Sequence, residues 1–144
     1  TQALTQRISA IFQTMTCPGL SGQIRTLSSE AGTVALEFEV AAALANPFGA
    51  LHGGVVATLL DACMGIAGTV KSGGALAMPL AEMKISFVRP IAPGVIIGRG
   101  ETIRLGKQLA FVEGTLLSAS GGVLARATGT ACPAPWPSGP APTR

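Results

Sequence analysis

The sequence predicts a single α+β domain in which a curved antiparallel sheet of five or six strands wraps around one central helix. Several runs alternate apolar and polar residues with the two-residue period of half-buried strands. Between these runs lies one long apolar stretch with a single charge, which is the pattern of a helix enclosed by the fold. The 144 residues suit one domain with a substantial core.

The N-terminal residues predict an amphipathic helix, because five apolar side chains share one helical face: Leu4, Ile8, Ile11, Phe12 and Met15. This segment lacks the basic start and continuous apolar core of a signal peptide. The three cysteines share no metal-type spacing, and their odd number argues against a disulfide framework. We therefore expect a cytoplasmic protein without a metal site.

Strand-like segments lie on both sides of the long apolar stretch. A short strand is expected near residues 24–27, and residues 33–40 alternate between apolar and polar types. After the apolar stretch, residues 81–87 alternate again, and Pro90 and Pro93 close that strand. Three further strands are expected at 95–105, 108–119 and 122–131, and their short joints predict an antiparallel meander.

The single domain is expected to span residues 1–132. Residues 133–144 contain five of the ten prolines in the chain. This composition predicts an extended, mostly disordered tail, in which Trp136 is at most a loose anchor.

The apolar stretch from Gly53 to Val70 is long enough to cross a membrane. A charged residue at the centre of such a span costs about 2.5–3.5 kcal/mol, and Asp61 lies near the middle. Four glycines lower the hydrophobicity further, and the rest of the chain reads as the strands of a soluble domain. We therefore predict a core helix and no membrane partner. Its small residues, which would let a sheet approach closely, are Ala57, Ala62, Gly65, Ala67 and Gly68.

The composition limits the classes of partner. The net charge of +3 comes from ten scattered basic residues, and aromatic residues that could stack on bases make up 4% of the chain. Nucleic acid is therefore not an expected partner. Only 12% of the residues are charged, so burial of apolar surface against a second subunit is expected.

The stretch "NPFGALHGGVVATLLDACMG", residues 46–65, contains the only Asn, the only His and the only Asp of the chain. Gly53 and Gly54 begin the predicted helix, where N–H groups lack intrahelical acceptors and the helix dipole is positive. These N–H groups could hold an oxyanion, and the Asn46 amide could add a donor. The alternative is structural: His52 and Asn46 would cap the helix and tie down the loop.

Asp61 predicts catalysis at this site, because a carboxylate in an apolar helix is costly unless it is paired or close to water. It would act as a general base or as a nucleophile. The alternative role is structural, at a subunit interface with bonds to backbone N–H groups. Asp61 lies about 12 Å along the helix from Gly53, so a carbonyl held at Gly53 could meet only the Asp61 of another copy. The spacing predicts a dimer with antiparallel central helices and two shared sites.

A Cys63–His52 pair is a second candidate nucleophile. Cys63 lies within the apolar helix, where a thiol resists ionisation, so Asp61 is the preferred candidate.

The pattern N-x5-HGGVVATLLD resembles the signature of hotdog-fold acyl-CoA thioesterases, including the phenylacetate-pathway and 4-hydroxybenzoyl-CoA enzymes. Further matches are "AEMKISFVRPI", "GKQLAFVEGTLLS" and "GGVLARATGTA", and the similarity runs from about Gln23 to Ala131. The resemblance implies hydrolysis of an acyl-CoA to a free acid and CoA, with no metal and no cofactor apart from the CoA of the substrate. It implies homodimers or pairs of dimers.

The resemblance also implies roles for individual residues. The Gly53 N–H and the Asn46 amide would bind the thioester oxygen, His52 would orient the site, and Asp61 of the neighbouring subunit would be the base or nucleophile. Two positions depart from the family, since relatives have a water-orienting Thr where this chain has Gly65, or Ser or Thr where it has Leu80. Thr69 is a candidate replacement.

The remaining expected substrate contacts come from the helix start, the next strand and the basic residues. They are Gly54, Leu80, Arg89, Lys107 and Gln108, with Arg104 and Arg126 as further candidates for the CoA phosphates. Each cation could equally be a solvated surface charge.

The expected function is hydrolysis of a medium-chain or aryl acyl-CoA. Two alternatives stay open: a hotdog enoyl-CoA hydratase or dehydratase, and a non-catalytic acyl-CoA-binding module.

Overall fold

The period-two segments of the sequence form a curved antiparallel sheet. The computed structural model describes residues 2–4, 6, 10 and 24–136. Buried and more exposed side chains alternate along β2, which matches the predicted pattern. The elements in chain order are β1 (Ile24–Glu30), β2 (Thr33–Val40), the short 3-10 helix η1 (Ala42–Leu44), α2 (Gly53–Lys71), β3 (Leu76–Ala77), β4 (Leu80–Phe87), β5 (Gly94–Leu105), β6 (Ala110–Leu117), β7 (Val123–Ala131) and β8 (Ala134–Pro135).

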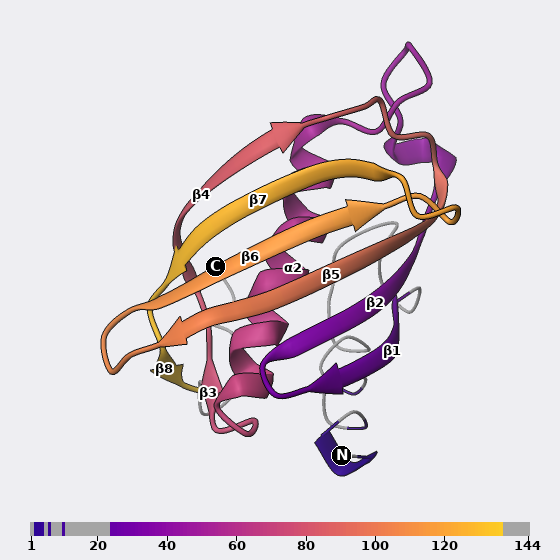
Figure 1. Ribbon diagram of the computed structural model, residues 1–144. Helices are drawn as coiled ribbons and strands as arrows, with labels where there is room; N and C mark the ends of the chain where they lie inside the picture. The colour runs from indigo at the N-terminus through magenta and orange to yellow at the C-terminus, as the bar shows by residue number, and fades with distance from the viewer. Residues whose placement is uncertain (1, 5, 7–9, 11–23, 137–144) are drawn as a thin grey trace, which may run out of the picture.

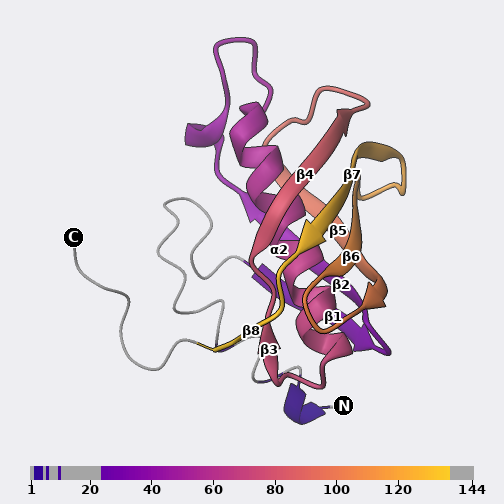
Figure 2. The same ribbon diagram turned by 90° about the vertical axis from the view of Figure 1, so that its left-hand side faces the viewer.

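The large sheet has six strands in the order β1-β2-β5-β6-β7-β4, and every neighbouring pair is antiparallel (Figure 1). The predicted meander is confirmed, because β5, β6 and β7 are consecutive in both sequence and sheet. β4 follows the helix in the chain but lies at the far edge, beside β7 (Figure 2). The two edges of the sheet are therefore β1 and β4.

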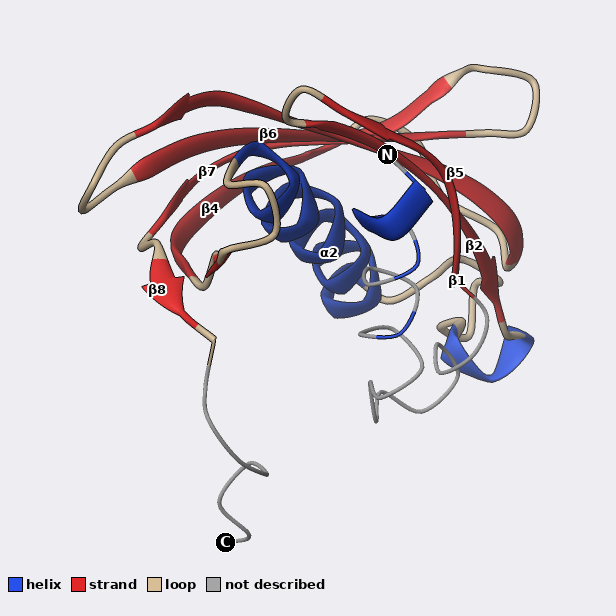
Figure 3. Cartoon of the chain, turned by 90° about the horizontal axis from the view of Figure 1, so that it is seen from below, coloured by secondary structure: helices blue, strands red, loops and turns tan. Residues whose placement is uncertain are grey.

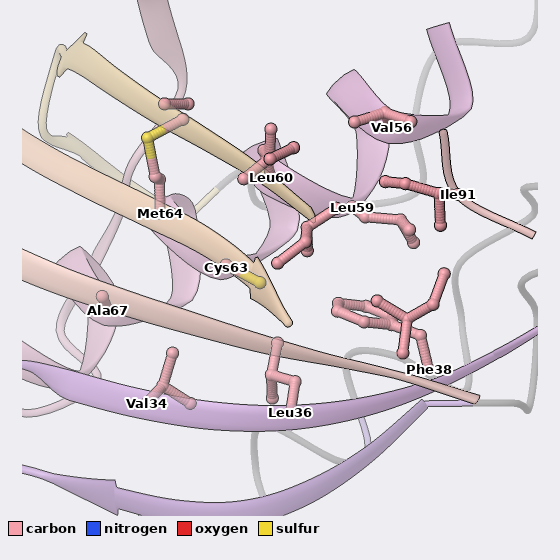
Figure 4. Close-up of a cluster of buried hydrophobic side chains, with 14 of the residues drawn as sticks. Val34, Leu36, Phe38, Val56, Leu59, Leu60, Cys63, Met64, Ala67 and Ile91 are labelled. Carbon is pink, nitrogen blue, oxygen red and sulfur yellow. The ribbon is translucent and has the colours of Figure 1, made fainter. Parts of the chain in front are cut away.

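Helix α2 lies in the concave side of the sheet, as the view from below shows (Figure 3). Leu59, Leu60, Cys63 and Met64 on the sheet side of the helix are fully buried. They pack on strand residues such as Phe38, as the close-up shows (Figure 4). Burying each large apolar side chain contributes about 1.5–3 kcal/mol, so this layer supplies much of the folding free energy. The core-helix prediction is thus confirmed.

Within the described residues, α2 is the helix whose length and composition would allow it to cross a membrane, and half of its most apolar window is buried inside the fold. Packing inside the fold therefore accounts for the buried half of this apolar sequence.

Glycines in the sheet let α2 approach closely. A Cβ atom added at Gly98 would collide with the Cys63 sulfur, and one at Gly100 would collide with the Cys63 carbonyl oxygen. A Cβ at Gly114 would lie 3.1 Å from the Met64 side chain. Of the small helix residues predicted for this contact, Ala67 lies close to Gly100, whereas Gly65 and Gly68 lie against Met78 and Ala62 lines the open side of α2. The close approach to the sheet therefore depends mainly on glycines in the strands.

We expect Gly100→Ala to destabilise the fold by about 1–3 kcal/mol or more, because the clash is with helix backbone that cannot rotate away. Urea unfolding followed by circular dichroism measures this loss. Gly54→Ala is the matched control, since no atom lies within 4 Å of its added Cβ. Equal stability of the two variants would contradict the close packing of α2 on β5.

The two ends of the chain are described only in part. Residues 2–4, 6 and 10 are helical, and Leu4 packs against the core. Ile8, Ile11, Phe12 and Met15 of the predicted N-terminal helix lie outside the described residues.

The ordered part of the chain continues past the predicted domain boundary at residue 132. Ala134 and Pro135 form β8, which pairs with β3, and the Trp136 indole N–H donates to the Gly74 carbonyl at 3.1 Å. Proline is tolerated here because a two-stranded ribbon is all edge. Residues 137–144 of the predicted tail lie outside the described part of the chain.

Candidate functional site

The loop before α2 is held by Asn46. The Asn46 side-chain oxygen accepts hydrogen bonds from the N–H groups of Phe48 (2.9 Å) and Ala50 (3.2 Å). The backbone N–H of Asn46 donates to the Ala50 carbonyl at 2.7 Å. Asn46 therefore ties down its own loop, as the structural alternative expected. Within the described residues its Nδ2 group makes no hydrogen bond, so two N–H donors remain for a ligand.

The start of α2 presents free backbone donors. His52 is the N-cap residue, and its side chain makes no capping hydrogen bond. The His52 carbonyl accepts from the N–H groups of Val55 (2.9 Å) and Val56 (3.2 Å). Gly53 and Gly54 are exposed, and their N–H groups have no acceptor within the described part of the chain. The predicted oxyanion-binding geometry, two donors at the positive end of a helix, is thus available.

A surface depression of about 310 Å³ adjoins this helix start. Its walls come from the loop before α2, the first turn of α2 and the segment after β4. The Leu51 N–H donates a hydrogen bond to the Ile91 carbonyl at 2.8 Å, which ties the loop to that segment. Phe87 and Arg89 line it together with Gly53. Among the predicted basic contacts, Arg89 is thus the one that the structure brings to Gly53 of the same chain.

Asp61 lies on the side of α2 that faces away from the sheet. It is exposed, and no hydrogen bond or ion pair within the described residues involves its carboxylate. Partial burial nevertheless raises the pKa of Asp61 above its usual value, because the charged form loses water. The bonds to backbone N–H groups that a structural role would require are therefore not made within the described part of this chain.

Asp61 opens onto a groove of about 440 Å³ that runs along α2. One wall is a stripe of the helix, and the other comes from the segment between β3 and β4 together with the end of the described chain. The lining residues are Thr58, Asp61, Ala62, Gly65, Ile66, Thr69, Ala77, Met78, Pro79, Leu80 and Trp136. Leu80, an expected substrate contact, lines the same groove as Asp61.

The structure does not bring Asp61 and Gly53 of one chain together. Both residues belong to the uninterrupted helix Gly53–Lys71, so about 12 Å of helix separates them. A group bound at Gly53 is out of reach of the Asp61 carboxylate in the same chain.

The Cys63–His52 pair is wrong. Cys63 is fully buried and its sulfur faces Gly98 of β5, whereas His52 is exposed at the helix start. Burial also raises the pKa of the Cys63 thiol, so the thiol stays protonated. Cys63 lies eleven residues beyond His52, about 16 Å along the helix axis, so the two side chains cannot share a proton.

Lys107 and Gln108 lie at the opposite end of the molecule from Gly53. They occupy the exposed turn between β5 and β6, at the sheet end where α2 finishes beside Gly32. Arg104 is exposed near the same end, at the close of β5. Arg126 points from the convex face of the sheet, since its neighbours Ala125 and Ala127 are buried on the helix side. Within one chain these cations are not assembled around Gly53.

The candidates for orienting water have different places. Thr69 is buried and lies about 12 Å beyond Asp61 along α2, too far to hold a water at its own chain's Asp61. Gly65 provides no hydroxyl. Thr58, which the sequence reasoning missed, lies one turn before Asp61 on the same face, and its hydroxyl donates to the Gly54 carbonyl at 2.9 Å. Its oxygen can still accept a hydrogen bond from water. The three-residue spacing in "TLLD" was the available signal.

No group of three or more His, Cys, Asp or Glu side chains that could hold a metal ion occurs among the described residues.

Comparison with known proteins identifies the family. Residues 48–125 match the family model described as the thioesterase superfamily. Human acyl-coenzyme A thioesterase 13 (Homo sapiens) is 30% identical over 125 residues, which cover 86% of this chain and 89% of that protein.

Two solved structures share the fold. The E. coli PaaI protein from the phenylacetic acid degradation operon has a TM-score of 0.79 at 21% identity, covering 91% of this chain and 93% of that one. The protein smu.793 of Streptococcus mutans UA159, bound to acetyl CoA, has a TM-score of 0.69 at 24% identity, covering 78% of this chain and 89% of that one. The long central helix wrapped by a six-stranded antiparallel sheet agrees with the predicted hotdog architecture. This chain therefore belongs to the thioesterase superfamily and has its hotdog fold.

Proposed function

We propose that this protein hydrolyses the thioester of a medium-chain or aryl acyl-CoA to a free acid and CoA, at sites shared between two subunits. One observation carries the proposal: the only aspartate of the chain lies in a groove on the open side of the helix whose first turn offers unbonded N–H groups. The name of the human relative, an acyl-coenzyme A thioesterase, supports the choice of substrate.

A homodimer would complete the site. β4 is an edge strand, and of the strands in the described chain only β7 pairs with it. Antiparallel pairing of two β4 strands across a two-fold axis would satisfy these edges and run the two α2 helices in opposite directions. In that arrangement Asp61 of one subunit lies towards Gly53 of the partner subunit. The open groove face of α2 agrees with such an arrangement, and a pair of dimers could form from the same unit.

The proposed reaction uses the two halves of the site together. The Gly53 N–H and the Asn46 Nδ2–H donate to the thioester oxygen, and His52 helps to orient the loop that carries them. The Asp61 carboxylate of the other subunit takes a proton from water, the water oxygen adds to the thioester carbon, and the negative charge moves to the bound oxygen. When the C–S bond breaks, the proton passes from Asp61 to the departing CoA sulfur.

Direct attack by Asp61 would give the same products through a mixed anhydride that water then cleaves.

The CoA portion is proposed to lie along the rim of the shared site. Arg89 lines the depression beside Gly53 and can bind an anionic group. Lys107 and Gln108 lie at the other end of each subunit, so they would serve a substrate held at Gly53 of the partner subunit. Gly54 adds a backbone donor, and Leu80 lies where the acyl group begins.

The direct test is release of free thiol from a panel of acyl-CoAs with purified protein. One thiol released for each acid formed supports the proposal. Saturable binding without thiol release would identify a binding module instead. Loss of the double bond of an enoyl-CoA, with the thioester intact, would identify a hydratase. The same panel gives the preferred acyl group.

We expect kcat/KM to fall in acid with a midpoint above the ordinary aspartate pKa of about 3.9. The reason is that Asp61 must be ionised to act, and partial burial raises its pKa. Activity should therefore rise with pH through a window that starts above the ordinary value. Steady-state kinetics in overlapping buffers, with folding checked at each pH, measures this fall of kcat/KM at acid pH. A flat profile down to the ordinary value would contradict the role of Asp61.

A further inference from the structure

Trp136 is fixed beside the groove that contains Asp61. Its indole N–H donates to the Gly74 carbonyl at 3.1 Å, and the N–H of Gly74 in turn donates to the Thr69 carbonyl at 2.9 Å. The preceding residues, Ala134 and Pro135, pair with β3. The ring is therefore attached both to the end of α2 and to the ribbon that forms the other wall. These contacts hold the Trp136 ring at a defined place in the groove, although Trp136 lies outside the large sheet.

The groove between Asp61 and Trp136 has a mostly apolar lining. Its helix wall consists of small or aliphatic residues, Ala62, Gly65 and Ile66, and ends at Thr69. A Cβ at Gly65 would lie 3.7 Å from the Met78 carbonyl oxygen, so the strand segment runs close against the helix. About 12 Å of helix separates Asp61 from Thr69. Within the described residues no cation lines this groove.

The chemistry at Asp61 decides what can occupy this groove, and this step rests on the proposed function. The thioester carbon must lie beside Asp61, so the acyl chain and the pantetheine arm that it joins both start at this residue. The pantetheine arm leads to phosphates, which need cations and N–H donors. The acyl substituent is the apolar one, and the apolar stretch towards Trp136 is where it can be buried.

We propose that Trp136 is the end wall of the acyl-binding groove and limits the length of the acyl chain that the enzyme accepts. Each methylene buried along the groove should raise kcat/KM by about fourfold. Once the chain reaches the indole, a further methylene must displace the ring and break its hydrogen bond to Gly74, or remain in water. The gain per methylene then ends.

The test measures kcat/KM for straight-chain acyl-CoAs of increasing length with the wild type, Trp136→Leu and Trp136→Ala. We expect the preferred length to increase in that order, and the ratio of long-chain to short-chain kcat/KM to rise about tenfold or more in Trp136→Ala. For the shortest substrate, kcat/KM of each variant should stay within about twofold of the wild-type value. Trp136→Phe retains a ring and should keep a profile near that of the wild type.

Phe111→Ala is the matched control, because Phe111 is an exposed aromatic residue on β6 whose neighbours Ala110 and Val112 face the core. It should leave the profile unchanged. If Trp136→Ala lowers kcat/KM equally at all lengths, Trp136 is only a structural anchor, and the proposal is overturned. An unchanged profile in both Trp136→Leu and Trp136→Ala would overturn it as well.

Failure of the proposed hydrolysis is distinguishable from failure of this inference. If the wild type cleaves no thioester, calorimetric binding of non-hydrolysable S-alkyl-CoA thioethers still reports on the groove. We then expect the length of the tightest-binding thioether to increase from wild type to Trp136→Leu to Trp136→Ala. The same optimum in all three proteins would overturn the role of Trp136 in either case.

Discussion

Asp61→Asn is expected to lower kcat by about 10²–10⁴-fold while the protein stays folded and keeps its subunit composition. Asparagine has nearly the same shape, but it can neither take a proton from water nor attack a thioester. Thiol release at saturating acyl-CoA measures kcat, and light scattering after gel filtration measures the size of the particle. Because binding contacts are retained, KM should change much less than kcat.

The stability of this variant gives an independent check. Burial raises the pKa of Asp61 in the folded state, so the folded protein holds that proton more tightly than the unfolded chain does. The corresponding stabilisation is present at low pH and is lost as the pH rises through the folded-state pKa. At neutral pH the charge therefore opposes folding, and Asp61→Asn should have an equal or higher Tm.

A carboxylate elsewhere provides the control for Asp61→Asn. Glu101 is exposed on β5, across from Glu113 on the convex face of the sheet. Glu101→Gln also removes one negative charge and should leave kcat unchanged. An Asp61→Asn protein that is unfolded, monomeric or fully active would return Asp61 to a structural role.

Gly53→Pro is expected to lower kcat by about 10²–10³-fold, because it removes one N–H that donates to the oxyanion. Proline is suited to the first helical position, where the N–H has no intrahelical acceptor. The preceding residue is compatible as well, since His52 has φ −57° and ψ 143°, the extended conformation that proline requires before it. The helix should therefore form normally.

Gly53→Ala is the matched control, because it keeps the N–H and adds only a Cβ that would lie 3.5 Å from the Phe87 ring, an ordinary contact. Its kcat should stay within a few-fold of the wild type. Equal losses in Gly53→Pro and Gly53→Ala would mean that crowding, and not the lost donor, causes the effect.

Combining the two inactive variants tests whether the site is shared. In a mixed dimer of Asp61→Asn and Gly53→Pro, one site carries both defects and the other carries neither. Co-expression should therefore restore about a quarter of the wild-type sites when subunits pair at random. A site built within one chain would predict no recovery, and this outcome would contradict the shared arrangement.

Much of the site was predictable because it depends on neighbours in the sequence. The helix start at Gly53 follows from local backbone preferences, and the fixed rise of a helix gives the separation of Gly53 and Asp61 without any tertiary contact. Two strands of the main sheet, at residues 33–40 and 81–87, were predicted from their two-residue period, and the other four from short strand-like runs bounded by turns. Thr58 could have been included by the same logic, since its spacing to Asp61 is local.

Other features could not be predicted because they depend on contacts between distant segments. The register that places β4 against β7 sets one edge of the sheet, and no local pattern in β4 encodes it. The turn that carries Lys107 matched the family in sequence. Its place at the end of the molecule opposite to Gly53 could not be predicted, because it depends on the direction in which β5 crosses the helix. Trp136 looked like part of a loose tail because proline-rich composition says nothing about a pairing with β3.

The sequence alone determined the order of helix and strands, the buried character of α2 and the chemical groups of the site, since these depend on side-chain type and short-range geometry. The tertiary structure decided which face of α2 stays open, which cation lies beside Gly53 and which distant residues line the groove that contains Asp61. The physical reason is that packing and strand register join segments far apart in the chain, and their free energy depends on the whole core.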